Sequence, residues 1–329
     1  MVLRPIFFEK VWGGRALETL GKHLPPNVNI GESWELADMG STSASGAGGG
    51  AARSLIDNGP LAGKTLADAA AMWGEQMIGG HSLTPTGGFP LLVKFLDAHE
   101  NLSIQVHPSP AYAASHRGAN LKTECWYILH AEPGAVIYKG LIAGVTPAAL
   151  AAHIADGTVV KDLIAVPAVV GDCHNLPSGT IHALGAGVVV AEVQMPSDTT
   201  FRVYDWGRTG RELHVKEALE CTDFVHPAPP ATRLESGQHK ARLVTTEFFT
   251  LDEHAVGSGD AISVGDGSGP AVVIALHGSA SMGDLLSDKP RVELRAGQTC
   301  VIPAFNSGWD SIVAGPQGVR VLVARLAKG

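Results

Sequence analysis

A short strand-like segment, residues 102–107, carries polar side chains at alternate positions. Side chains two residues apart on a β-strand point to the same face, so Gln105 shares a face with His107, and Lys122 shares one with Glu124. Imidazole, carboxylate and amide oxygen ligands brought together would bind a metal ion. A lysine beside such a centre indicates a catalytic site.

A second imidazole follows a turn signature, Gly171-x5-Pro177-x-Gly179-x2-His182. The glycines and the proline predict a tight turn, and the strand after it would present His182 inward, as small antiparallel barrels do. A lone histidine is more often an ordinary half-buried residue. The metal site is therefore predicted only for the whole set, which is Gln105, His107, Glu124 and His182.

This ligand set fits Zn²⁺, while iron, cobalt and manganese stay open because ligand softness alone does not decide among them. The set contains one anionic ligand, so the centre keeps a net positive charge and suits an anionic or enolate-bearing substrate. It has no thiolate and so differs from a structural zinc site. An open coordination position for water or substrate is expected.

Further polar residues follow on strand-like segments. Thr200, Arg202 and Tyr204 alternate and are predicted on one face. Arg202 offers a planar fork for a phosphate or a developing oxyanion, although an ion pair with Glu192 or Asp198 is the structural alternative. For Lys122 the alternative is a solvated strand residue.

The elements that must position these residues are mostly strands and turns. The 329 residues include 40 glycines and 20 prolines with only 6% aromatic residues, and 45% hydrophobic residues suffice for a substantial core. A few segments carry distinct signatures: helices at 54–80, 147–164 (interrupted by Gly157) and 214–220, a buried strand at 90–96, and a mobile low-complexity loop at 43–50.

A weak internal repeat predicts two related β units. Residues 127–131 resemble residues 274–278, and Gly171-x5-Pro177 matches Gly297-x5-Pro303. In the second copy the offset of the histidine falls on Gly308, so that unit keeps the turn and loses the ligand. Chance recurrence of a Gly/Pro turn pattern is the alternative.

Composition excludes several classes of function. The net charge of −8 argues against nucleic acid or an anionic membrane as a partner. Four scattered cysteines form no C-x-x-C pair and predict reduced, buried thiols. Neither a signal peptide nor an apolar stretch of transmembrane length is found, so a cytoplasmic protein is expected.

The chain resembles the type I mannose-6-phosphate isomerases, in particular the short bacterial members of this branch of the cupin superfamily. The resemblance spans about residues 5–220 and beyond them rests mainly on 297–304. It is carried by these segments: Gly31-Glu32-Ser33-Trp34-Glu35, residues 90–97, residues 102–108, Lys122-Thr123-Glu124-Cys125-Trp126-Tyr127, residues 179–183, residues 197–205 and Arg211-Glu212-Leu213-His214-Val215.

The resemblance implies a mainly β fold of two cupin-type jelly-roll barrels with a helical insertion and a metal site in the first barrel only. Residues 1–230 would form the catalytic cupin domain, including the helical segments at 54–80 and 147–164. Residues 231–329 would form a second, degenerate cupin-like β domain without metal ligands.

The resemblance further implies interconversion of mannose 6-phosphate and fructose 6-phosphate through a cis-enediol, with one zinc ion per chain as Lewis acid. Arg202, Lys122 and Glu192 would be catalytic, and Ser103, Lys94 and Arg202 would contact the substrate or its phosphate. The proton carrier stays open between Glu192, Lys122 and a zinc-bound water.

Three alternatives remain: an isomerase of another phosphorylated aldose, an Fe²⁺ cupin dioxygenase, and a non-catalytic sugar-phosphate binding protein. The expected partner is a small sugar phosphate, and the expected state is a monomer or weak homo-oligomer.

Overall fold

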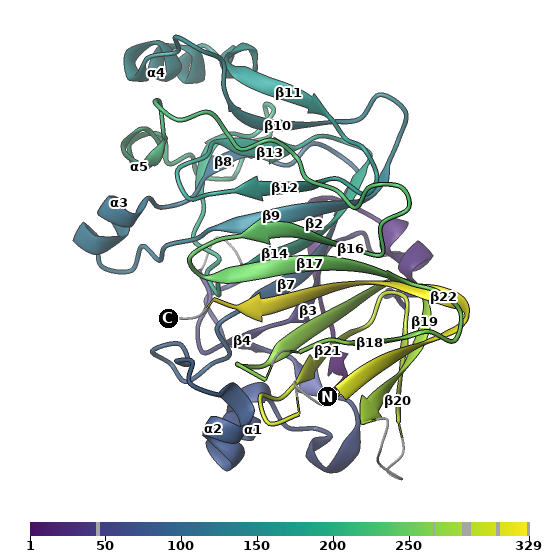
Figure 1. The fold of residues 1–329 in the computed structure, drawn as a ribbon. Coiled ribbons are helices and arrows are strands. Elements are labelled where there is room, and N and C mark those ends of the chain that lie inside the picture. Colours follow the sequence, from purple (N-terminus) through teal and green to yellow (C-terminus); the bar gives the residue numbers. More distant parts are fainter. Residues whose placement is uncertain (44–46, 266, 285–290, 307–309, 328–329) are drawn as a thin grey trace.

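The computed structural model describes residues 1–329 except 44–46, 266, 285–290, 307–309 and 328–329. Strands dominate it, as predicted, and most of them fall into three antiparallel sheets (Figure 1). Sheet I has the order β11-β10-β13-β8-β15: Leu163–Pro167, Val136–Leu141, His182–Leu184, Ile104–Val106 and Phe201–Tyr204. Sheet II has the order β12-β9-β14-β7-β3-β2: Cys173–Leu176, Glu124–Ala131, Val188–Gln194, Leu92–Ala98, Ile30–Leu36 and Ile6–Gly14.

Sheet III lies in the C-terminal third of the chain. It has the order β16-β17-β22-β19-β20, with β18 on β22 and β21 on β19: Lys240–Thr245, Phe249–Val256, Asp310–Leu326, Ala271–Asp284, Val292–Arg295, Ala261–Ser263 and Thr299–Ile302. Two short pairs complete the strands: β1 with β6 and β4 with β5, at Leu3–Arg4, Leu55–Ile56, Asp38–Met39 and Ala52–Arg53.

Sheet II shares one hydrophobic core with each of the other sheets. Alternate side chains of β9 point to opposite faces, so Trp126 packs with Ile137 of sheet I while Tyr127 packs with Leu251 of sheet III. Strand β7 is buried along its whole length, as the apolar run at 90–96 predicts. Burial on both faces fixes the strand register, because a slip of one residue would exchange the two cores.

Helices lie at the periphery, α1 and α2 at one end and α3 to α5 beside sheet I (Figure 1). Their bounds are α1 Leu66–Trp73, α2 Glu75–Ile78, α3 Pro110–Ser115, α4 Pro147–Ala155 and α5 Val215–Cys221, with 3-10 turns η1 Ala16–Leu20, η2 Gly59–Leu61 and η3 Val159–Asp162. The short helix predicted at 214–220 is confirmed as α5.

The helix predicted at 54–80 is wrong in its first part, because β6 and η2 occupy it. Pro60 and Gly63 break the pattern, and α1 begins only after Thr65, whose side chain accepts from the Asp68 N–H. The prediction for 147–164 holds for α4. Gly157, at φ 76°, then ends the helix, and η3 and the start of β11 follow.

The predicted repeat is visible in the strand pairing. β9 pairs with β12 as β19 pairs with β21, and a bulge leaves Leu129 unpaired against β14 just as one leaves Leu276 unpaired against β22. The N–H of each repeated glycine, Gly171 and Gly297, donates to the residue before that bulge over 3.0 and 2.8 Å. Shared register and shared irregularity argue against chance recurrence. Two closed barrels, and the division at residue 230, stay predictions.

The N-terminal segment packs against the C-terminal third of the chain. Val2 forms a bridge with Cys300, and the Val301 N–H donates to Met1 O over 2.8 Å. Lys22 lies in a buried ion pair with Glu35 at 2.6 Å and also donates to Gly297 O at 2.5 Å. Sheet II and the repeated turn of sheet III are therefore tied together by a buried charge.

Of the loop predicted at 43–50, residues 44–46 lie outside the described part, so its mobility stays a prediction. All four cysteines are buried free thiols, as expected. In the described part of the chain, no helix has the length and apolar character needed to span a membrane.

Candidate active site

One row of polar side chains crosses sheet I. Lys139 lies opposite His182, His182 opposite Gln105, and Gln105 opposite Arg202. Residues directly opposite each other in antiparallel strands share a face. Strand pairing therefore brings together three of the residues predicted for the site from segments that are far apart in the sequence.

A second row crosses the facing side of sheet II. Trp126 lies opposite Glu192, Glu192 opposite Lys94, and Lys94 opposite Trp34. The first residue of β9, Glu124, shares the face of Trp126 and carries its carboxylate to the end of this row. The site lies where the two rows meet.

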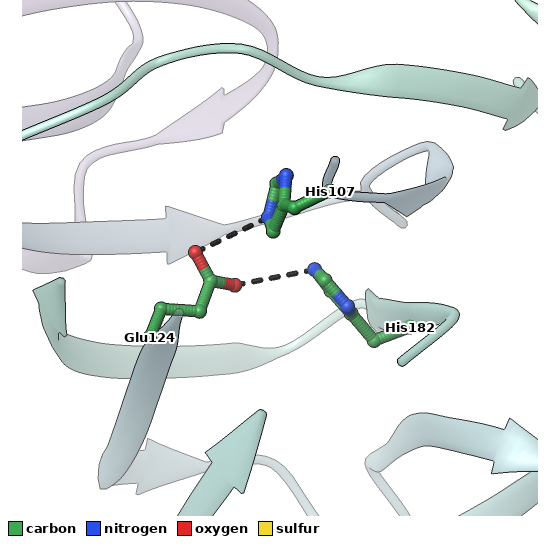
Figure 2. A group of neighbouring side chains, drawn as sticks. All are labelled: His107, Glu124 and His182. Atoms are coloured by element: carbon green, nitrogen blue, oxygen red, sulfur yellow. Dashed lines mark ion pairs between the residues drawn. The ribbon is translucent and has the colours of Figure 1, made fainter. Parts of the chain in front are cut away.

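His107, Glu124 and His182 converge (Figure 2). The Nε2 atom of His107 lies 3.3 Å from Glu124 Oε2, and that of His182 lies 3.2 Å from Glu124 Oε1. One ligand atom from each residue falls within 4.8 Å of the others, and all three side chains are buried. This spacing is short enough for one ion to contact all three.

Backbone carbonyls fix both imidazoles. His107 Nδ1–H donates to Thr199 O over 3.0 Å, and His182 Nδ1–H donates to Thr180 O over 2.7 Å. Each ring thus presents its Nε2 lone pair to Glu124, which is the orientation that metal-binding histidines adopt. Burial, followed by the Lys122 charge, lowers the pKa of His107 to about 3, so this ring is neutral at physiological pH.

The fourth predicted ligand, Gln105, lies at the same point. Its Nε2 is 3.3 Å from His182 Nε2. A half-turn of the amide group would bring its oxygen to this position, so the side chain can reach an ion at the centre.

Lys122 lies beside the carboxylate, with its Nζ 2.6 Å from Glu124 Oε2. Burial alone would raise the pKa of Glu124, but Lys122 and then His107 hold it well below its usual value. Glu124 is therefore an anion at neutral pH. Lys122 is only 3% exposed, so the solvated strand position considered from sequence is excluded.

Arg202 faces a cavity lined by some residues of both rows, and among the described residues it forms neither of the ion pairs considered for it. Its Nη1–H donates to Glu212 O over 2.7 Å, its Nε is buried without a partner, and burial followed by Arg211 lowers its pKa. Asp198 instead accepts the Ser43 N–H over 2.7 Å. The guanidinium of Arg202 is thus oriented by a backbone carbonyl and not neutralised by a carboxylate.

Lys94 and Ser103 line the same cavity, but Lys94 is already paired. Its Nζ is 3.0 Å from Glu192 Oε1, 3.9 Å from Glu32 Oε2, and 5.0 Å from the centre of the Trp34 ring. Burial alone would lower the pKa of Lys94, but Glu192 and Glu32 raise it, so it stays charged. Trp126 Nε1–H donates to the other oxygen of Glu192 over 2.8 Å.

The alternation predicted for Thr200, Arg202 and Tyr204 is wrong at its end. Thr200 and Arg202 line the cavity, but a bulge before Tyr204 sets that residue opposite Ile104. Its ring then packs against Trp206 on the other side of sheet I. A bulge adds a residue to one strand and reverses the faces beyond it.

Sequence reasoning missed several polar residues of the cavity, namely Lys10, Glu32 and Arg211. Lys10 Nζ lies 3.2 Å from Glu32 Oε1, and Lys94 and Lys10 hold the pKa of Glu32 at about 2 against the opposing effect of burial. The alternation of Glu32 with Trp34 in a strand-like segment was a signal that could have placed Glu32.

Comparison with known proteins gives a consistent picture. A family model described as "Phosphomannose isomerase type I, catalytic domain" matches residues 1–123. The mannose-6-phosphate isomerase of Streptococcus mutans is 32% identical over 317 residues, which are 94% of each chain. Mannose-6-phosphate isomerase ManA of Bacillus subtilis is 34% identical over 265 residues, 78% of each chain.

Solved structures agree with these sequence matches. The crystal structure of the Bacillus subtilis mannose 6-phosphate isomerase has a TM-score of 0.83 at 30% identity and covers 98% of both chains. A mutant phosphomannose isomerase from Salmonella typhimurium has a TM-score of 0.75 at 18% identity, with 99% of each chain covered, and shows likeness of fold alone.

Proposed function

We propose that this chain, which belongs to the type I phosphomannose isomerase family, interconverts mannose 6-phosphate and fructose 6-phosphate at the site around His107, Glu124 and His182. One observation carries the proposal: these ligand atoms converge within 4.8 Å, and Lys122, which contacts Glu124 at 2.6 Å, lines a cavity together with Arg202. The arrangement combines a metal-capable centre with cationic groups, which suits an anionic sugar substrate.

The buried donor set fits a divalent metal ion. His107 Nε2 and Glu124 Oε1 are buried without hydrogen-bond partners, and both imidazoles hold their Nδ1 protons on carbonyls. Nitrogen and oxygen ligands with one carboxylate suit Zn²⁺, with Gln105 as the fourth ligand. We propose one zinc ion per chain, which when bound would act as a Lewis acid toward the sugar carbonyl and its neighbouring hydroxyl.

The side chains of the cavity would perform the remaining steps. Isomerisation moves a proton between C1 and C2 through a cis-enediol, and negative charge develops on the two oxygens. Lys122 would stabilise this charge from beside Glu124, and Arg202 would hold the phosphate with its fixed fork, together with Ser103. These roles place cations at both ends of an open-chain sugar.

Glu192 is the carboxylate that we propose as proton carrier. Trp126 and Lys94 each contact one of its oxygens, so its orientation is fixed within the row that faces the metal centre. A fixed carboxylate at the cavity wall can exchange a proton with a carbon held in front of it. In this role Lys94 would hold the Glu192 carboxylate in place. The contact of Lys94 with the substrate phosphate would be secondary to this ion pair.

Removal and return of metal test the proposal. We expect protein stripped of metal with a chelator to lose isomerisation of mannose 6-phosphate, and one equivalent of Zn²⁺ to restore it. As a control, His130→Ala removes an exposed histidine from β9, the strand of Glu124. This variant should respond to metal removal and return as the wild type does. Full activity in stripped protein that retains no metal would refute the metal-dependent mechanism.

The same assay separates the alternatives. Conversion of another phosphorylated aldose at a higher kcat/KM would reassign the substrate. Oxygen uptake by iron-loaded protein would favour the dioxygenase, and tight sugar-phosphate binding without turnover would favour a binding protein. A cytoplasmic location, the absence of a nucleic-acid partner and a monomeric or weakly oligomeric state remain proposals.

A further inference from the structure

The pairing of sheet II is repeated in sheet III across five strands. β3, β7, β14, β9 and β12 correspond to β16, β17, β22, β19 and β21 in the same spatial order (Figure 1). The bulge at Leu129 and Leu276 is one shared irregularity. A second bulge is also shared: Glu35 of β3 is unpaired against β7, and Leu243 of β16 is unpaired against β17 at the equivalent point. Within these five strands, the register therefore assigns each paired residue of sheet II an equivalent in sheet III.

This equivalence locates a counterpart of the active-site row. Trp34 lies opposite Lys94 as Arg242 lies opposite Asp252, and Glu32 is replaced by Lys240. The charges are thereby inverted at these two positions, while the place of Glu192 is taken by Val323. In sheet II a lysine is flanked by carboxylates, whereas in sheet III a carboxylate is flanked by cations.

Sheet III has its own polar cavity at this row. Three cationic side chains converge there on Asp252, which is fully buried: Arg325 Nη1 lies 2.8 Å from its Oδ2, Lys240 Nζ lies 3.7 Å away, and Arg242 forms an ion pair with it. Among the described residues that line this cavity, Asp252 is the only carboxylate. The cluster therefore keeps an excess of positive charge in a chain whose net charge is −8.

The cavity also presents donors in a fixed arrangement. Arg325 is held by Asp252 and by its Nη2–H bond to Val264 O at 2.6 Å, and its buried Nε has no partner. Thr250 and Ser263, which carry hydroxyl groups, also line the cavity. Guanidinium, ammonium and hydroxyl donors around a polar cavity are the groups that bind phosphate.

We propose that the cavity of sheet III around Lys240, Arg242 and Arg325 binds a phosphate group, at a site separate from the active site. The occupant is free orthophosphate or the phosphoryl group of a small metabolite, since both offer the same oxygens. In sheet III, the positions equivalent to Lys94 and its neighbours would thus bind an anion. The inference stands whether or not the chain isomerises mannose 6-phosphate.

Calorimetric titration of the full chain with inorganic phosphate at low ionic strength tests the proposal. An Arg202→Met background removes the phosphate contact proposed for the active site, and binding is expected to persist there. Adding Lys240→Gln and Arg242→Gln should weaken it at least tenfold, because two half-exposed cations are lost. Lys64→Gln with Lys161→Gln makes the same charge change at exposed positions elsewhere and should leave the affinity within twofold.

The opposite charge change gives an independent test. Asp252→Asn removes the carboxylate that neutralises the cluster, so phosphate should bind several-fold more tightly, a gain that a merely structural ion pair would not give. Competition by glycerol 2-phosphate would identify a phosphoryl group as the ligand, and its absence would restrict the site to orthophosphate. Unchanged affinity in the double glutamine variant, or complete loss of binding in Arg202→Met alone, overturns the proposal.

Discussion

Two neighbouring residues of β9 allow the role of Glu192 to be tested against a close control. Trp126 donates its indole N–H to Glu192 Oε2, and Tyr127 donates its hydroxyl to Glu253 Oε1, each over 2.8 Å. Both hydrogen bonds are buried and end on a carboxylate, but they lie on opposite faces of the strand. Only the bond of Trp126 reaches the active-site row.

Trp126→Phe and Tyr127→Phe each remove one such bond. A hydrogen bond to a charged group contributes about 1.5–3 kcal/mol, so each variant should lose roughly that much free energy of unfolding, with a further loss for the smaller ring in Trp126→Phe. Because about 1.4 kcal/mol corresponds to a tenfold change in rate, Trp126→Phe should lower kcat by about 10- to 100-fold. Tyr127→Phe should leave kcat unchanged.

The measurements are urea unfolding, metal content and steady-state kinetics on mannose 6-phosphate. Metal content should stay at the wild-type value in both variants, since neither residue is a proposed ligand. Equal losses of kcat in the two variants would show that the effect is general destabilisation. A wild-type kcat in Trp126→Phe would refute the claim that this bond positions Glu192.

Three further outcomes are expected. Burial lowers the pKa of Lys139 from 10.5 to about 8, so holding its charge in the folded protein costs about 3 kcal/mol below pH 8, and this cost disappears as pH rises toward 10.5. Lys139→Met removes this pH-dependent cost together with the pH-independent hydrogen bond to Pro229 O, so denaturant titrations should show the stability of the variant relative to the wild type falling between pH 7 and pH 10. In Gly297→Ala the new methyl group would overlap Leu20 O, whereas in Gly237→Ala it would meet nothing within 4 Å at a similar φ. Only the first variant should therefore lose more free energy of unfolding than the roughly 1 kcal/mol of left-handed strain, as measured by urea unfolding. Arg202→Lys keeps the charge but loses the fork, so kcat/KM should fall at least tenfold, and an unchanged value would remove its proposed phosphate role.

The metal-capable cluster was accessible from sequence because strand alternation and one turn signature are local patterns. Gln105, His107 and His182 each sit in such a pattern, and the structure brings them to one point with Glu124. The predominance of strands and the repeat were accessible for the same reason. The closure of the sheets into barrels depends on long-range geometry and stays a prediction.

The misses come from features that local pattern does not carry. A bulge reversed the face of Tyr204. The shorter helix within 54–80 is an exception, because Pro60 and Gly63 could be read from the sequence. The pairing of Lys94 with Glu192 depends on which strands are neighbours, and no periodicity within β7 reveals it. Lys10 belongs to the same cross-strand network and has no such pattern, whereas the alternation of Glu32 with Trp34 was a local signal that could have placed Glu32.

The ties between the first residues and the turn near residue 297 constrain how the chain can fold during its synthesis. Val2 and Lys22 leave the ribosome long before Cys300 and Gly297, their partners, exist. Until then the buried ammonium of Lys22 has Glu35 but not its carbonyl, and the edge at β1 stays uncovered. Contacts of such large sequence separation form late and slowly. Strand β1 should therefore be among the last to be locked, and nascent chains halted short of residue 300 should stay sensitive to protease near Val2.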